Sequence, residues 1–278
     1  MQPLHQLRGS SATLLLTLAA RAESGRVIAA SAFSDPEARR IAAALPLDLS
    51  AYVRDAAFVR GVVLRAALID GFAAEFFAAH PLGMGITLGA GLCTRRSRLG
   101  SRVARSGGVD WLNVDLPDAI CLREQQVTLD EGERNLACSV LDPAWLDAAG
   151  LPGDRPVLLM LEGVCPYLPQ APLEAMLHRL AERFTRCGCA CVVVLDYVHP
   201  ILASMPVQVG GMHLPVLSGF EDSGRIAGIH PSIRVISEDH PYSQFSEQHR
   251  FFETEFREKT GHWPYTVARF ALGSQHDG

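Results

Sequence analysis

Four apolar runs in the chain each end in residues that can bind a ligand. In an open parallel sheet the ligand lies at the carboxyl ends of the strands, so the residues that close each run are candidates for a site. The runs at 86–88, 111–114, 136–140 and 157–161 are followed, in that order, by Gly89, Ala90 and Gly91, by Asp115, by Leu141 and Asp142, and by Glu162. The sequence therefore predicts one binding site assembled from four strand ends.

The first two groups favour a nucleoside as the ligand. Glycines let a nucleoside approach the backbone closely, and an acid at the end of the next strand can accept both ribose hydroxyls. Asp115 lies 24 positions beyond Gly91, which fits a strand–helix–strand unit. The dinucleotide fingerprint G-x-G-x-x-G needs glycine or alanine at position 94, where Thr94 stands. A nucleoside without a pyrophosphate is therefore favoured over NAD, and a tight turn without a ligand is the alternative for this glycine segment alone.

The elements that would position these residues belong to an α/β fold. Apolar residues at three- and four-residue spacing from residue 10 to about 80 predict helices. Further on, apolar runs alternate with helix-like stretches such as 172–184, which predicts a doubly wound, mostly parallel sheet. The runs at 233–236 and 266–272 predict closing strands, with an antiparallel direction as one option. We expect a helical cap at residues 1–80 and an α/β domain at 81–278, with a lid-like insertion at about 199–230.

The charge composition excludes several classes of protein. The 278 residues include 25 Lys plus Arg and 30 Asp plus Glu, and the net charge of −5 argues against a nucleic-acid partner. Lys259 is the single lysine, and no glycine-rich segment precedes it, which excludes a phosphate-binding loop of the G-x-x-x-x-G-K type. No apolar stretch of about 18 residues is present, so no membrane span is expected.

The seven cysteines are odd in number and lie mostly in apolar runs, which predicts reduced thiols in a cytoplasmic protein. Cys187, Cys189 and Cys191 precede an apolar run at two-residue spacing. This spacing predicts three sulfurs on one face of a strand and differs from the C-x₂₋₄-C pairs of zinc sites. No metal site is expected.

Four ordered segments of the chain carry a family resemblance. They are LGAGLCTRRSRL at 88–99, VDLP at 114–117, VLDPAWL at 140–146 and LEGVCPYL at 161–168. Together they resemble the leucine carboxyl methyltransferase superfamily, and more closely its bacterial branch of O-methyltransferases associated with polyketide biosynthesis. Matches near residues 13–24 and 35–36 extend the resemblance over most of the chain. The resemblance implies a class I methyltransferase sheet with S-adenosyl-L-methionine as the methyl donor.

The resemblance also implies a role for each candidate residue at the first two strand ends. Gly89, Ala90 and Gly91 would lie against the methionine and ribose portion of the donor. Asp115, followed by Leu116, would hold the ribose hydroxyls.

The remaining candidates would contact the other parts of the donor and the acceptor. Leu141 and Asp142 would flank the adenine, and Glu162 would face the amino-acid end of the donor. Arg60 matches a family arginine whose guanidinium would grip the donor carboxylate. Tyr167 matches a family tyrosine close to the methyl-transfer site, where its ring would face the sulfonium or its hydroxyl would orient the acceptor.

Each of these assignments has a structural alternative. Arg60 can be a solvated helix residue, Asp142 a helix N-cap before Pro143, and Tyr167 a core residue. The arginines between positions 95 and 105 are most simply the exposed face of a helix.

One residue departs from the family pattern. Cys93 stands where the family usually has aspartate, in a segment that commonly has the sequence G-A-G-L-D-T-R. With one lysine in the chain, arginines such as Arg21 or Arg26 would have to hold an acidic acceptor.

The leading hypothesis is methyl transfer to a carboxylate or phenolic hydroxyl of a small secondary metabolite by a cytoplasmic monomer or homodimer. One alternative is an enzyme that consumes S-adenosyl-L-methionine without transferring its methyl group, by intramolecular displacement. A second alternative is a regulator that binds the nucleoside without turnover.

Overall fold

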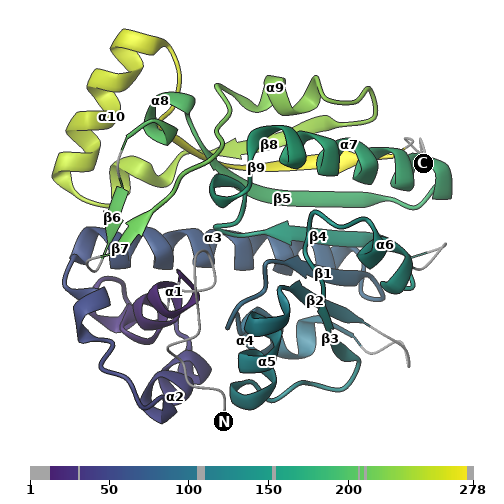
Figure 1. Ribbon diagram of the computed structural model, residues 1–278, viewed down its shortest axis with the longest axis horizontal. Helices are drawn as coiled ribbons and strands as arrows, with labels where there is room; N and C mark the ends of the chain where they lie inside the picture. Colours follow the sequence, from purple (N-terminus) through teal and green to yellow (C-terminus); the bar gives the residue numbers. More distant parts are fainter. Residues whose placement is uncertain are drawn as a thin grey trace.

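The computed structural model describes residues 13–30, 32–104, 110–151, 155–205, 207–209 and 212–273. Its centre is a seven-stranded sheet in the order β3-β2-β1-β4-β5-β9-β8 (Figure 1). The strands are β1 (Met84–Leu88), β2 (Trp111–Asp115), β3 (Glu133–Ala137), β4 (Val157–Leu161), β5 (Cys191–Val198), β8 (Arg234–Asp239) and β9 (Tyr265–Leu272). β1 to β5 pair in parallel, and β9 runs antiparallel to both β5 and β8. The expected doubly wound, mostly parallel sheet is confirmed.

Helices cover both faces of this sheet. The longer ones are α1 (Thr13–Ala22), α2 (Pro36–Ala44), α3 (Ala56–Ala79), α5 (Pro117–Gln126), α7 (Gln170–Cys187) and α10 (Glu247–Thr260). Shorter helices are α4 (Arg95–Leu99), α6 (Ala144–Ala148), α8 (Pro200–Ala203) and α9 (Ser223–Ala227), and β6 (Val207–Val209) pairs with β7 (Met212–Leu214). No helix in the described ranges is long and apolar enough to cross a membrane.

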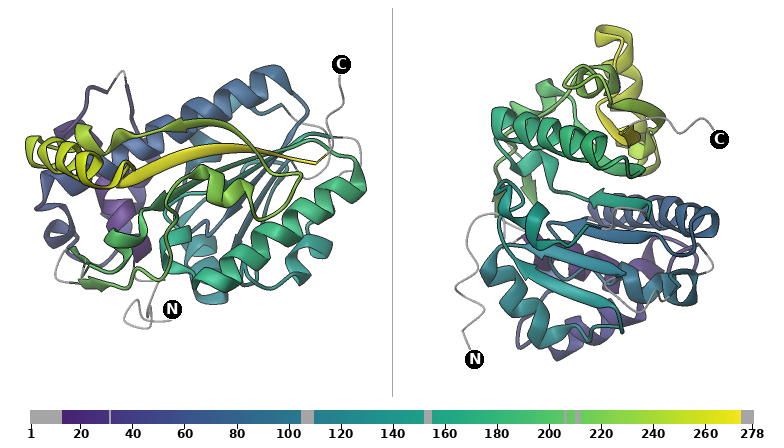
Figure 2. Two further views of the ribbon diagram at one scale, coloured as in Figure 1. Left: turned by 90° about the horizontal axis from the view of Figure 1, so that it is seen from above. Right: turned by 90° about the vertical axis from the view of Figure 1, so that its right-hand side faces the viewer.

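The core forms on the two faces of the central strands. Every residue of β1 and β4 is buried, as expected for parallel strands covered on both sides. α3 packs on one face, where Phe77 stacks on Trp111 with ring centroids 5.9 Å apart. α7 packs on the other face through its buried stripe, which includes Leu173, Leu177 and Phe184. Figure 2 shows the two helices on opposite sides of the sheet.

The N-terminal helices join this core without a break. Asp35 caps α2 by accepting a hydrogen bond from the backbone N–H of Ala38 at 2.9 Å, as the Asp35-Pro36 pair predicts. Leu14, Leu15 and Leu18 of α1 share a buried cluster with residues of α2 and α5. α3 contacts the other N-terminal helices at one end and the sheet at the other. The division between a cap at 1–80 and a domain at 81–278 therefore stays a prediction.

Two local predictions are wrong. The third strand covers 133–137 and not 136–140, because polar residues of this edge strand pair with their neighbours, as Asn135 does with Arg123 at 3.1 Å. The apolar signal instead marks the following turn, where Val140 is buried. Cys187 ends α7, Gly188 turns the chain at φ 68°, and only Cys191 lies in β5, so the three sulfurs do not share a strand face.

The 199–230 segment lies against the loop that follows β4. The backbone N–H of Leu217 donates to the carbonyl of Pro166 at 2.7 Å, and the Ser218 hydroxyl donates to the carbonyl of Cys165 at 2.7 Å. Residues 206, 210 and 211 are outside the described ranges. A lid function for this segment stays a prediction.

Candidate functional site

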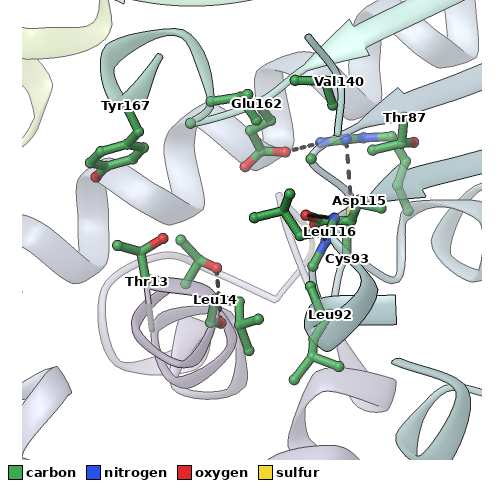
Figure 3. A pocket seen from close by; sticks show the side chains of 18 of the residues that line it. Thr13, Leu14, Thr87, Leu92, Cys93, Asp115, Leu116, Val140, Glu162 and Tyr167 are labelled. Atoms are coloured by element: carbon green, nitrogen blue, oxygen red, sulfur yellow. Dashed lines mark hydrogen bonds and ion pairs between the residues drawn. The ribbon is translucent and has the colours of Figure 1, made fainter. Parts of the chain in front are cut away.

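A cleft opens at the carboxyl ends of β1, β2 and β4, where the sequence predicts the ligand site. Its volume is about 1050 Å³, including the opening to solvent. The strand ends form one side, and Thr13, Leu14 and Thr17 of α1 form the opposite side. Figure 3 shows Asp115 and Glu162 on the strand side and Tyr167 near the residues from α1.

The turn after β1 requires glycine for two reasons. Gly89 and Gly91 have φ values of 70° and 45°, a left-handed conformation that side chains disfavour. A Cβ atom at position 89 would also collide with Cγ2 of Val164. The backbone N–H groups of Gly89 and Ala90 both donate to the carbonyl of Val114, at 2.8 and 3.2 Å. The turn therefore brings bare backbone to the wall of the cleft.

Asp115 ends β2 and faces this turn. Its Oδ2 accepts the backbone N–H of Gly91 at 2.6 Å, and its Oδ1 accepts the N–H of Leu116 at 2.7 Å. Burial raises the pKa of Asp115, while these two N–H groups oppose the rise. Each oxygen keeps a further lone pair that can accept a ligand hydroxyl.

Glu162, which follows β4, is held between two guanidinium groups. Arg65 Nε donates to Glu162 Oε1 at 3.2 Å, and Arg95 Nη2 donates to Oε2. Burial opposes ionisation, but Arg95 and Arg65 hold the pKa of Glu162 well below its usual range. All three side chains line the cleft. Glu162 is therefore a carboxylate that stays charged at neutral pH.

The ion pairs of Glu162 continue through Arg95 into a buried network that reaches α1 and α2. Asp70 accepts from Arg95 at 2.6 Å and from Arg98 at 2.7 Å. Asp35 accepts from Arg98 at 2.8 Å and from Arg21 at 3.1 Å.

This network contradicts the expected exposed face for the arginine run. Arg95 is 1% exposed and donates to Asp70 of α3 and to Glu162, and Arg96 is 7% exposed and donates to the backbone carbonyl of Gly100. Arg102 is exposed as expected, and Arg105 lies outside the described residues.

Seven of the ten predicted site residues line the cleft. They are Gly89, Ala90, Gly91, Asp115, Leu116, Glu162 and Tyr167. Arg60, Leu141 and Asp142 are not among its lining residues.

Arg60 is exposed and lines a separate hollow between the start of α3 and the start of α10. Five residues further along the same helix, Arg65 faces the cleft. Five residues turn a helix by about 140°, which explains why one arginine points to solvent and the other to the site. The structure thus brings Arg65 to the cleft in place of Arg60.

Asp142 is exposed and accepts the backbone N–H of Ala144 at 2.9 Å at the start of α6. The contact stabilises the turn that leads into α6, but the N-cap position of this helix is Pro143, one residue after the Asp142 of the N-cap alternative. Because β3 ends early, the chain reaches the cleft sooner, through Ser139 and Val140. Trp145 Nε1 holds this turn by donating to the carbonyl of Val140 at 3.0 Å.

Sequence reasoning missed Arg65 and Arg95 as cleft residues. A signal for Arg65 was present, because this charged residue falls within the apolar stripe of α3 beside Ala66 and Ile69. Cys93, the departure from the family pattern, also lines the cleft, and its Sγ lies 3.8 Å from Arg95 Nη1. The parts of the chain that the structure describes contain no cluster of three or more metal-ligating side chains.

The sheet order, the glycine turn and the acid at the end of β2 define the class I fold of S-adenosyl-L-methionine-dependent methyltransferases. A Thermobifida fusca protein assigned to the methyltransferases shares this fold, with a TM-score of 0.51 at 12% identity over 92% of this chain and 94% of its own. The chain belongs to the leucine carboxyl methyltransferase family, whose model matches residues 14–181.

Two curated relatives carry more specific names. Tetracenomycin polyketide synthesis O-methyltransferase TcmP of Streptomyces glaucescens is 34% identical over 175 residues, which cover 63% of this chain and 62% of TcmP. The S-adenosyl-L-methionine-dependent methyltransferase dpfgK of Gibberella zeae is 32% identical over 197 residues, covering 66% of this chain and 64% of dpfgK. The matches thus span less than two thirds of each relative.

Proposed function

We propose that the protein transfers the sulfonium methyl group of S-adenosyl-L-methionine to a carboxylate or phenolic oxygen of a small secondary metabolite. The observation that carries the proposal is the contact of the glycine turn with Asp115, whose Oδ2 lies 2.6 Å from the Gly91 nitrogen at the wall of the cleft. The name of TcmP, a polyketide O-methyltransferase, supports oxygen as the acceptor atom.

The strand ends suit the nucleoside part of the donor. The turn at Gly89 and Gly91 offers backbone without side chains for close approach. The lone pairs of Asp115 that the backbone leaves open can accept both ribose hydroxyls. Leu116 and Val140 offer apolar surface for the adenine from the ends of the next two strands.

The ion pair of Arg65 and Glu162 suits the amino-acid end of the donor. Arg65 presents a guanidinium for the donor carboxylate, and Glu162 presents a carboxylate for the donor ammonium. This assignment gives Arg65 the role that the sequence suggested for Arg60.

The remaining lining residues would hold the acceptor. When bound, the donor supplies an electrophilic methyl group, which passes to the acceptor oxygen while the sulfur keeps the electron pair of the broken bond. Leu14, Val164 and Leu168 exclude water from this part of the cleft, which favours an in-line approach. Burial raises the pKa of Tyr167, so its hydroxyl stays protonated and can donate to the acceptor.

The ionisation of the site favours an acceptor that arrives as an anion. No histidine is among the described lining residues, and the strongly lowered pKa of Glu162 makes it a weak base. A carboxylate acceptor needs no base, and its methylation gives a neutral ester with no proton transferred. A phenol acceptor would have to be acidic enough to ionise before attack.

Calorimetry with S-adenosylhomocysteine tests the donor site. Binding by the wild type and loss of binding by Asp115→Ala are expected, and absence of wild-type binding would overturn the proposal. An acceptor panel read by mass spectrometry tests the reaction. A methylated product supports methyl transfer, a new nucleoside product without acceptor supports donor-only chemistry, and binding without any product supports a regulator.

Two further features stay predictions from the sequence. They are the cytoplasmic location and the monomeric or homodimeric state.

A further inference from the structure

Asp196 is a buried carboxylate that does not line the cleft but bonds two residues that do. Asp196 lies near the end of β5, and its side chain is 1% exposed. Its Oδ2 accepts from Arg65 Nη1 at 3.2 Å, and its Oδ1 accepts the backbone N–H of Gly163 at 2.5 Å. Arg65 and Gly163 both line the cleft, whereas Asp196 is not among its lining residues. Asp196 therefore ties the guanidinium to the loop after β4.

Tyr265 holds this carboxylate from the neighbouring strand. Its hydroxyl donates to Asp196 Oδ2 at 3.1 Å. The antiparallel register of β5 and β9 pairs Tyr265 with Val198, two residues beyond Asp196, and so places the hydroxyl beside the carboxylate. Tyr265 is buried, and burial raises its pKa well above its usual range, so the hydroxyl remains a donor.

Two ion pairs fix the orientation of the Arg65 guanidinium in the cleft. Its Nε bonds to Glu162 and its Nη1 bonds to Asp196, so two carboxylates from β4 and β5 hold two edges of one planar group. Gly163 leaves room for this group, since a Cβ atom there would lie 2.9 Å from Arg65 Nη2. A guanidinium held in this way loses little further freedom when it binds an anion.

We propose that Asp196, supported by Tyr265, is a positioning residue for donor binding: it holds Arg65 and the Gly163 loop in the geometry that grips the amino-acid end of the donor. The proposal rests on the proposed function of the cleft. It predicts an effect on donor affinity that is larger than any effect on the methyl-transfer step.

Asp196→Asn tests the contact with Arg65 selectively. The amide keeps an oxygen for the Gly163 N–H but turns a donor toward the guanidinium. We expect the Kd for S-adenosylhomocysteine and the KM for the donor to rise about 10- to 100-fold, with kcat changed by less than about threefold. Tyr265→Phe removes one hydroxyl and should raise the same Kd about threefold to tenfold; it serves as the second variant if Asp196→Asn does not fold.

Asp110→Asn is the matched control. Asp110 is also 1% exposed and pairs with an arginine, Arg155, at 2.8 Å, but it precedes β2 at the other end of the sheet from the cleft. It should lower stability and leave the Kd for S-adenosylhomocysteine within about twofold.

A double-variant cycle with Arg65→Met shows whether Asp196 acts through Arg65. The added effect of Asp196→Asn should largely vanish in the Arg65→Met background. Provided that the wild type binds S-adenosylhomocysteine, two results would overturn this proposal alone. One is full additivity of the two substitutions, and the other is a Kd for Asp196→Asn equal to the wild-type Kd. A wild type that binds neither donor nor product would overturn the proposed function along with it.

Discussion

Arg65 Nε lies 3.2 Å from Glu162 Oε1, and this contact joins α3 to the residue that follows β4. The two residues are 97 positions apart, and both line the cleft. The same Glu162 carboxylate also accepts from Arg95, which continues to Asp70, Arg98 and Asp35. The N-terminal helices are thus bonded electrostatically to the candidate donor site.

Arg65→Lys and Arg60→Lys form a matched pair that separates the two arginines of α3. A lysine keeps the charge at position 65 but lacks the planar fork that bonds Glu162 and Asp196 together. We expect Arg65→Lys to raise the Kd for S-adenosylhomocysteine about 10- to 100-fold, because charge-assisted hydrogen bonds are lost. Arg60→Lys should leave this Kd within about twofold of the wild-type value. A comparable loss in Arg60→Lys by calorimetry would show that the exposed arginine also takes part in binding.

Gly89→Ala should weaken donor binding and destabilise the fold. At a φ of 70° a side chain is strained, and the added Cβ would collide with Val164. From the strain and the collision together, we expect a loss of about 1–3 kcal/mol in unfolding free energy and a more than tenfold rise in the Kd for S-adenosylhomocysteine.

Gly188→Ala controls for the backbone strain at Gly89. Gly188 has a φ of 68° at the end of α7, with nothing within 4 Å of an added Cβ. It should cost about 1 kcal/mol and leave binding unchanged. If both variants bind alike, the close approach at Gly89 does not matter for the donor.

The fold could be predicted because its signals are local. The buried strand β4 appears in the sequence as an uninterrupted apolar run and β1 as a mainly apolar one, and the Asp35-Pro36 pair marks the start of α2. β3 was misplaced because it is an edge strand whose residues Glu133 and Asn135 bond laterally, so its apolar content is low.

The site was predictable where it depends on strand ends and less so where it depends on helix phase. Asp115 and Glu162 directly follow apolar runs, which fixed their place at the carboxyl edge. Arg60 and Arg65 differ only in their position around one helix, and the place of Arg65 within the apolar stripe was the one signal that it faces inward. The burial of Arg95 and Arg98 depends on Asp70, an acid on a different helix, so no spacing along the chain indicates it.

The Asp35 network predicts a specific loss of stability in acid. Asp35 is 0% exposed; burial alone would raise its pKa, but Arg98 and Arg21 hold the pKa below its usual value. A lowered pKa means that the contribution to stability is fully present above the unfolded-state pKa of about 3.9, and is lost as the pH falls through the folded-state pKa. Asp35→Asn should therefore cost about 3 kcal/mol near pH 6, and the difference from wild type should shrink below about pH 4.

Urea unfolding across this pH range measures the difference. Asp147→Asn, an exposed change on α6, should track the wild type at every pH. A pH-independent difference for Asp35→Asn would mean that the ionised carboxylate does not stabilise the fold.

Tyr167→Phe separates acceptor orientation from donor binding. Tyr167 lines the cleft together with Thr13 and Leu14 of α1 (Figure 3). Because burial raises its pKa, the hydroxyl remains a hydrogen-bond donor through the neutral range and adds no pH dependence there. Removing one such donor should lower kcat/KM for the acceptor about threefold to tenfold and leave the Kd for S-adenosylhomocysteine within about twofold. Steady-state kinetics with any acceptor found by the panel, together with calorimetry, measure the two values. An equal loss in both would show that the hydroxyl contacts the donor instead. If the ring rather than the hydroxyl faces the sulfonium, neither value should change, because phenylalanine keeps the ring.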